Sequence, residues 1–232
     1  MKTAKEIIAG VKEILATKWE TRKGTKVPEP EDVKLGNDAV LLDGTVLYAD
    51  MADSTALVNG FKDWFAAEVY KCYLTAACHL IRNNSGVITA FDGDRVMAVY
   101  IGGSKNSSAA KSALQLSWAV NEINAKLKAA YPSTAFELRQ SVGIDTSSLF
   151  VARTGIRDSN DLVWVGRAAN YAAKLSGISD SSASIFMTEP VFDVLSDETK
   201  YGGNPKRSMW ERSHWQERNI TIYKSNWSWE PS

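Results

Sequence analysis

Apolar residues recur along the chain at two spacings, and each spacing predicts one kind of element. Between Ile7 and Leu15 they recur every three or four residues, which predicts an amphipathic helix. The same spacing over 61–81 and 104–130 predicts two long helices, the first ended by an Asn-rich turn and the second by Pro132. A shorter helix is expected over 168–175.

Shorter apolar runs between turn residues predict strands. They cover 46–50, 87–91, 95–100, 136–144, 148–152, 162–165, 184–187, 209–215 and 220–224. The polar segment 153–160 is expected to be a mobile loop, and 20–38 has the composition of an exposed connection, so the core is expected to begin near Leu41. The order βα-ββ-αβ predicts an α+β sandwich in which helices cover one face of a sheet that contains antiparallel strands.

The length of 232 residues favours a single main domain. We expect an N-terminal amphipathic helix and linker over 1–40, then one domain over 41–232 that ends in a Trp-rich tail. Lysine plus arginine equals aspartate plus glutamate at 27 each, so no overall charge favours a nucleic acid partner. Charges interrupt the apolar residues of the first twenty positions, so we expect a cytoplasmic protein without membrane insertion.

One predicted strand, 46–50, ends in an acid. The next residues include Asp53 and Ser54, either of which can cap a helix that begins near Thr55. This arrangement places the Asp50 carboxylate beside a helix N-terminus, whose free N–H groups suit an anion such as a phosphate. A carboxylate beside an anion site requires a cation between them.

A second acid follows a predicted tight hairpin. The Asp92-Gly93 pair joins two apolar runs, and Asp94 comes directly after it. If this hairpin lies beside the strand of Asp50, the two carboxylates converge on one site, and oxygen ligands of this kind select Mg²⁺ or Mn²⁺. Taken alone, Asp53 and Asp92 are better interpreted as a cap and a hairpin residue.

Three separated segments together resemble the catalytic domain of the class III nucleotidyl cyclases. They are Tyr48-Ala49-Asp50-Met51, Gly93-Asp94 and the stretch from Val163 to Leu175, which carries a glycine, an asparagine and a basic residue. The resemblance covers roughly residues 41–224 and implies a ferredoxin-like βαββαβ fold. It also implies that Asp50, Asp94 and the main-chain carbonyl of Met51 hold two divalent metal ions.

The resemblance assigns further roles to residues of the same segments. Main-chain N–H groups of Ala52, Ser54 and Thr55 would bind the phosphates of a nucleoside triphosphate. In this family the site lies between two subunits, so a homodimer is implied. Asn170 matches the residue that orients the ribose, and Lys174 stands where the family usually has a transition-state arginine, although the two could be merely an exposed i,i+4 pair.

The replacement of arginine by Lys174 is not neutral, because lysine lacks the planar guanidinium fork. Another arginine could compensate, and the candidates are Arg153, Arg157, Arg167 and Arg218. Of these, Arg218 lies where family members often carry a phosphate-binding lysine.

The residues that select the base depart most from the family pattern. Purine cyclases place polar side chains at the positions of Ala90 and Val163, which cannot hydrogen-bond a base through their side chains. The compact format, with Tyr48 before the first acid and Arg95 after the second, resembles the bacterial Pycsar pyrimidine cyclases. Tyr48 could stack on a pyrimidine or be a core aromatic, and Arg95 is expected to contact the nucleotide.

The resemblance therefore implies conversion of UTP to cyclic UMP and pyrophosphate. Cytidylate cyclase comes next and a purine cyclase third; a degenerate module that binds a nucleotide or a partner without turnover is the alternative from another class. The Pycsar resemblance further implies dependence on Mn²⁺ and a role in antiphage defence, in which a separate effector responds to the cyclic nucleotide.

Overall fold

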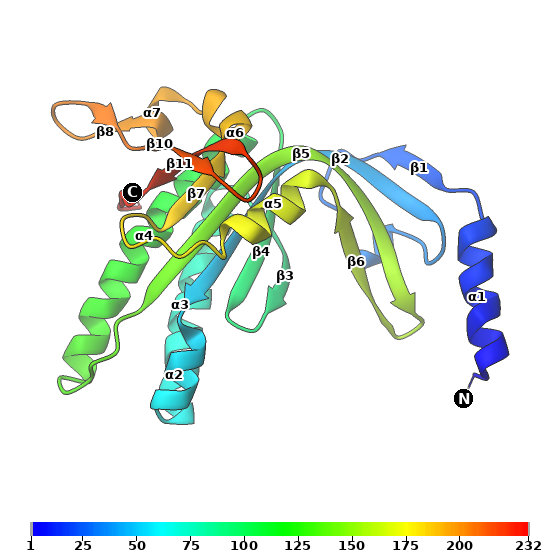
Figure 1. The fold of residues 1–232 in the computed structure, drawn as a ribbon, viewed down its shortest axis with the longest axis horizontal. Coiled ribbons are helices and arrows are strands. Elements are labelled where there is room, and N and C mark those ends of the chain that lie inside the picture. The colour runs from blue at the N-terminus through cyan, green and yellow to red at the C-terminus, as the bar shows by residue number, and fades with distance from the viewer. Residues whose placement is uncertain (1, 232) are drawn as a thin grey trace.

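The computed structural model describes residues 2–231, in which nine strands form one sheet (Figure 1). The strands run in the order β10-β11-β7-β5-β2-β4-β3, with β1 added beside β2 and β6 beside β5. Their bounds are β1 Glu20–Lys23, β2 Asp38–Ala52, β3 Val87–Asp92, β4 Arg95–Ile101, β5 Arg139–Ile156, β6 Ser159–Val165, β7 Ile185–Thr188, β10 Glu211–Trp215 and β11 Ile220–Ser225. The β5–β7 and β1–β2 pairs are parallel and the others antiparallel.

Seven α-helices and one 3-10 helix accompany the sheet in the described residues. They are α1 Ala4–Ala16, α2 Ser54–Gly60, α3 Asp63–Asn83, α4 Lys105–Ala130, α5 Arg167–Leu175, α6 Glu189–Asp193, α7 Asp197–Lys200 and the 3-10 helix Pro30–Asp32. Strands β8 Tyr201–Gly202 and β9 Arg207–Ser208 form a separate small hairpin. The predicted α+β class with helices on a mostly antiparallel sheet is confirmed.

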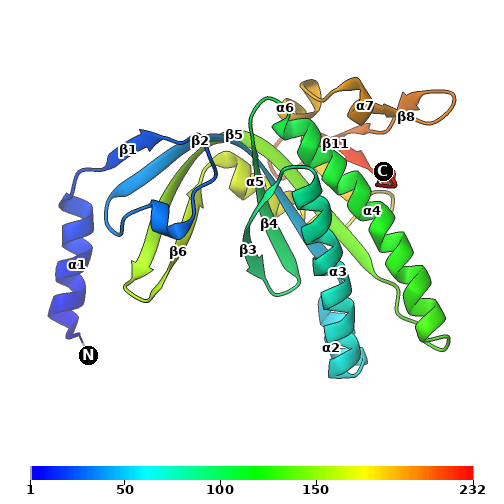
Figure 2. The same ribbon diagram turned by 180° about the vertical axis from the view of Figure 1, so that it is seen from behind.

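Alternation along β2 divides the core into two layers. Leu47, Ala49 and Met51 are buried with the apolar faces of α3 and α4. Val46 and Tyr48 point to the other face, where α5 covers the sheet with Ala168, Ala169 and Ala172. Helices therefore cover both faces of the sheet and not one face as expected, with α3 and α4 on one side and α5 on the other (Figures 1 and 2).

Three sequence-based expectations about local structure are wrong. The segment 20–38 is not simply an exposed connection, because it contains β1 and buries Val27 and Val33 against the sheet. The strands expected over 136–144 and 148–152 are one strand, β5, and the predicted mobile loop 153–160 is the hairpin that joins β5 to β6. The core accordingly begins before Leu41, and β2 runs across the expected boundary at residue 40.

Helix α1 is formed as predicted, with a capping box between Thr3 and Glu6. None of its residues is buried in the described chain, and its apolar stripe is exposed. Its C-terminal end is held by the Asn37 amide, which donates to the carbonyl oxygens of Ile14 and Thr17. Figure 2 shows α1 at the opposite end of the arched sheet from α2, α3 and α4.

No helix within residues 2–231 is long and apolar enough to cross a membrane.

Candidate active site

Two rows of side chains lie across neighbouring strands on the face of the sheet that carries α5. Register pairs Asp50 of β2 with Arg95 of β4, which in turn pairs with Asp92 of β3. One row further along, Tyr48 pairs with Met97, which pairs with Ala90. Because residues two apart on a strand share a face, both rows face the same side of the sheet.

The β3–β4 turn brings the second acid to the first. Gly93 occupies the left-handed region with φ +62°, which a tight hairpin requires of its turn residue. Asp94 follows it and is close enough to raise the pKa of the Asp50 carboxyl, although burial of Asp50 is the larger cause. The structure therefore brings the two predicted metal acids together at one corner, which we call the acid corner and define as Asp50, Met51, Asp94 and Arg95.

Arg95 supplies the cation that balances this corner in the described chain. Its Nη2 lies 2.7 Å and its Nε 3.1 Å from the Oδ2 atom of Asp50. Both contacts are with one oxygen, so the guanidinium does not engage Oδ1. The bond to Asp50 is the main cause that raises the pKa of Arg95.

The donor set at the acid corner fits a hard divalent cation. Within residues 2–231 no three His, Cys, Asp or Glu side chains are grouped to hold a metal ion, so a site here depends on two carboxylates and main-chain or substrate oxygens. Like-charged carboxylates in partly buried surroundings require a nearby cation, and Arg95 reaches only one oxygen of one of them. The residues present are therefore compatible with Mg²⁺ or Mn²⁺.

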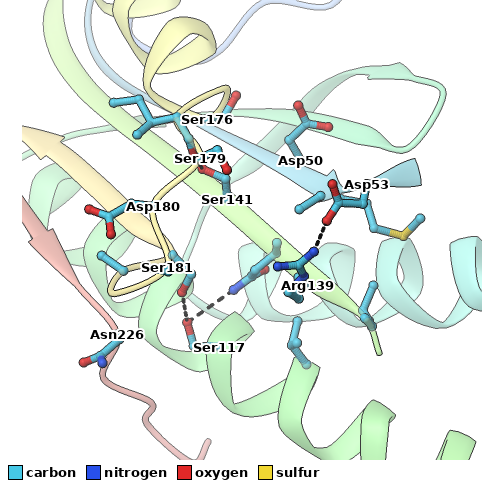
Figure 3. Close-up of a pocket in the computed structure, with 18 of the residues that line it drawn as sticks. Asp50, Asp53, Ser117, Arg139, Ser141, Ser176, Ser179, Asp180, Ser181 and Asn226 are labelled. Atoms are coloured by element: carbon cyan, nitrogen blue, oxygen red, sulfur yellow. Dashed lines mark hydrogen bonds and ion pairs between the residues drawn. The ribbon is translucent and has the colours of Figure 1, made fainter. Parts of the chain in front are cut away.

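A polar cavity of about 580 Å³ opens beside the acid corner (Figure 3). Asp50, Met51, Ala52 and Asp53 line one end. Side chains that the sequence did not single out line the rest, namely Ser117, Arg139, Gln140, Ser141, Ser176, Ser179, Asp180, Ser181 and Asn226 among others. They come from α4, from the start of β5, from the loop after α5 and, for Asn226, from the segment after β11, and serines in such segments carry no sequence signal for a site.

The start of α2 differs from the prediction in its cap. Asp53 occupies the cap position in a left-handed conformation, φ +59°, and neither it nor Ser54 makes a side-chain cap. Its carboxylate instead forms an ion pair with Arg139. The first helical bonds are those from the N–H groups of Ala56 and Leu57 to the Asp53 carbonyl, so the Ser54 and Thr55 amides belong to the turn that helices leave free.

The second group of predicted residues lies on α5 and beyond it. Asn170 and Lys174 are both exposed, one helical turn apart. Lys174 lies 3.7 Å from Glu217, which also contacts Arg218 at 3.1 Å. The structure thus gathers Lys174 and Arg218 around one carboxylate, but neither they nor Asn170 line the cavity beside Asp50.

Two of the arginines considered as substitutes are engaged within the chain. Arg153 donates to Asn160 and to the Val33 carbonyl. Arg167 forms a two-point ion pair with Asp145.

The two positions expected to contact the base also separate. Ala90 is half-buried beside Tyr48, whose phenol has a raised pKa, chiefly because it is buried. Val163 lies on β6 with its side chain exposed, since its neighbours Leu162 and Trp164 are the ones that pack inward. Of the side chains expected to contact the nucleotide base, Ala90, Tyr48 and Arg95 therefore form one surface beside Asp50, and Val163 lies apart from it.

The fold is that of the class III nucleotide cyclase catalytic domains. The solved adenylyl cyclase CyaB of P. aeruginosa matches with a TM-score of 0.64 at 18% identity, over 80% of this chain and 94% of that one. The guanylyl cyclase Cya2 matches with a TM-score of 0.67 at 17% identity, over 82% and 95%. A class III adenylyl cyclase-like ATP-binding protein from Pseudomonas aeruginosa gives 0.66 at 21% identity, over 89% and 48%. At these identities the likeness shows the fold.

Sequence relatives narrow the class. The uridylate cyclase of Xanthomonas perforans is 52% identical over 91% of both chains, and that of Burkholderia cepacia is 46% identical over 99% of both. The chain belongs to the uridylate cyclase family. No protein-family model matches it. The prediction of a nucleotide cyclase of the pyrimidine group is confirmed at the level of family membership.

Proposed function

We propose that the protein converts UTP to cyclic UMP and pyrophosphate. The observation that carries this proposal is the surface formed by Tyr48, Ala90 and Arg95 beside Asp50. It offers an aromatic ring, a small apolar wall and a cation, and it lacks the polar side chains by which purine cyclases select their base. The names of the two relatives above support uracil as the base.

The reaction is an intramolecular displacement. The 3′ oxygen attacks the α-phosphorus, loses its proton, and forms the new ester bond as the bond to the bridging oxygen of pyrophosphate breaks. Asp50 and Asp94, with the Met51 carbonyl, would hold two Mn²⁺ or Mg²⁺ ions, which when bound acidify the attacking hydroxyl and offset charge on the leaving group.

Residues of this chain would supply binding and orientation. The main-chain N–H groups of Ala52, Ser54 and Thr55 would donate to the phosphates. Arg95 would contact the nucleotide as it releases Asp50, and a protonated Tyr48 would stack on the ring or donate to it. Val163 is proposed as a wall of the same pocket supplied by the partner subunit, because it is exposed and lies on β6, which β4, β2 and β5 separate from the β3 strand of Ala90.

A homodimer completes the site in this proposal. Asn170 would orient the ribose, Lys174 would stabilise the transition state and Arg218 would bind phosphate, all from the partner of the chain that supplies the acid corner. Their exposure and their absence from the cavity beside Asp50 support an arrangement across two subunits. The product would act in the cytoplasm on a separate effector in antiphage defence.

Two alternatives remain tied to observations. A single-ring pocket also accepts CTP, so cytidylate cyclase is the second candidate. Engagement of Lys174 by Glu217 and of Asp50 by Arg95 is what a non-catalytic nucleotide-binding module would show.

One competition assay tests all of these readings. Purified protein is mixed with Mn²⁺ and equal concentrations of UTP, CTP, ATP and GTP, and the cyclic products are quantified. We expect cyclic UMP first, cyclic CMP next and purine products at least ~10-fold lower. Cyclic AMP or cyclic GMP as the main product would overturn the pyrimidine assignment, and no cyclic product would favour the binding module.

A further inference from the structure

A fully buried carboxylate lies under the helix that carries Asn170. Asp145 of β5 has no exposed surface, and its two oxygens accept from Arg167, the first residue of α5, at 3.0 Å from Nε and 3.2 Å from Nη2. Nη2 also donates to the Thr146 carbonyl at 2.7 Å, and the Thr188 hydroxyl donates to Asp145. The guanidinium is thus held in one plane by three acceptor atoms.

Burying the Asp145 carboxylate is costly, although the Arg167 side chain that pairs with it stays 45% exposed, so its presence calls for a role. Desolvation by burial raises the pKa of Asp145, and the Thr188 and Arg167 contacts act in the opposite direction. An apolar side chain of similar volume at the buried position is often as stable as a paired carboxylate, so stability alone does not favour this arrangement. What a two-point ion pair adds is direction, because the planar fork binds a carboxylate in one orientation.

Two further contacts fix the remaining degrees of freedom of α5. The Ser147 hydroxyl accepts from the Ala168 N–H at 2.9 Å at the start of the helix. Near its end the helix backbone lies so close to β5 that a Cβ on Gly143 would be 2.0 Å from the Ala172 carbonyl oxygen. Both ends of the helix are therefore set against one strand.

The placement of α5 against β5 also determines the direction in which its exposed side chains point. Ala168 and Ala172 are buried against the sheet, and Asn170 and Lys174, each two residues further on, point to the opposite side because two residues turn a helix by roughly 200°. A rotation of the helix about its axis would therefore redirect both exposed side chains together.

We propose that Asp145 and Arg167 are positioning residues, which fix the rotation of α5 so that Asn170 and Lys174 present the correct geometry to the nucleotide. This inference rests on the proposed roles of Asn170 and Lys174. It assigns Arg167 to α5 placement and not to direct contact with phosphate.

The test is a double-mutant cycle with UTP as substrate. Arg167→Lys keeps a positive charge beside the buried Asp145 but removes the fork, so the chain should fold. We expect kcat to fall ~10-fold with KM within ~2-fold, because the contact acts on orientation in the transition state. In a background that carries both Asn170→Ala and Lys174→Ala, whose residual turnover is followed at raised protein concentration, the same change should lower kcat by less than ~2-fold, because both groups being positioned are gone.

A matched control and a measurement independent of turnover separate this from stability. Arg153→Lys alters an arginine of β5 whose two hydrogen-bond partners, Asn160 and Val33, lie outside α5, and it should leave kcat within ~2-fold. Hydrogen exchange of the 168–175 amides should rise at least ~5-fold in Arg167→Lys and not in Arg153→Lys.

Unchanged exchange, or equal losses of kcat in both backgrounds, would overturn the inference. Absence of cyclic product from the unmodified protein would instead refute the proposed function, and the exchange result would still decide the placement of α5.

Discussion

The acid corner and the outer face of α5 are built in opposite ways. At the acid corner the charged side chains are partly buried, Arg95 pairs with Asp50, and Asp50 lines the cavity. Helix α5 is held against β5 by the ion pair between the exposed Arg167 and the buried Asp145 and by its close approach to Gly143, and the side chains with proposed roles on its outer face are exposed. The acid corner thus has a counter-ion within its own chain, whereas the outer face of α5 would be completed by another subunit in the proposed homodimer.

The largest effect is expected at the acid corner. Asp50→Ala and Asp94→Ala should each lower kcat/KM by ~10³-fold or more, because each removes a proposed ligand of the metal ions that would offset the charges developing in the reaction. Asp43→Ala, which removes an exposed acid of the same strand, is the matched control and should leave turnover within ~2-fold. Measurable cyclic product at near-normal rates from both site variants would remove the acid corner from the mechanism.

Tyr48 tests how the acid corner joins the base pocket. Tyr48→Ala should raise the ratio of purine to UTP turnover ~10-fold, because the ring that limits the pocket is removed. Tyr48→Phe keeps the ring and should keep the preference if shape decides it, whereas an equal loss in both variants would assign selectivity to the hydroxyl. An unchanged ratio in Tyr48→Ala would show that Tyr48 is only a core aromatic.

Glu217 tests whether its contacts keep the side chains of Lys174 and Arg218 away from the nucleotide. Glu217→Gln frees Lys174 and Arg218 from a surface carboxylate, and exposed pairs of this kind contribute little to stability. We expect the KM for UTP to fall ~2- to 3-fold, the reverse of what loss of a binding residue does. A raised KM with unchanged folding would mean that Glu217 itself contacts the nucleotide.

The last prediction concerns stability and the loop that lines the cavity. Bonds from Ser182 and Lys224 lower the pKa of Asp180 to about 2. A lowered folded-state pKa stabilises the fold above the unfolded value near 3.8, and this contribution is lost as the pH falls toward 2. Asp180→Asn should therefore cost ~1 kcal/mol of unfolding free energy at pH 7, discounted for solvent screening, with the difference shrinking below pH 4. Urea titrations at pH 7 and pH 3.5 measure it, and a constant difference would contradict the cause given.

Much of the fold was predictable because it depends on local patterns. The apolar spacing of α3 and α4, the Asp92-Gly93 turn and the acid at the end of the β2 strand all carry short-range signals, and the structure has the elements they predict. The predicted cyclase fold follows from the same motifs and is confirmed.

The errors arose where tertiary contacts override composition. Residues 145–147 look like a turn, yet Asp145, Thr146 and Ser147 stay within β5 because each side chain finds a partner in α5, β2 or β7. The polar 153–160 segment is ordered as a hairpin for a similar reason, since Arg153 and Asn160 bond across it. The serine-lined cavity was missed because its members come from five separate segments of the chain.

The central claim is that the acid corner of one chain works with the α5 face of another. Its most direct test mixes two variants that each retain little turnover, Asp50→Ala and Asn170→Ala, under conditions of demonstrated subunit exchange. Each mixed dimer would contain one intact site, so activity should return to about one quarter of the unmodified level. The matched mixture of Asp50→Ala with Asp94→Ala, whose lesions lie in the same region, should stay inactive. Continued inactivity of the first mixture despite exchange would contradict the claim and place the whole site within one chain.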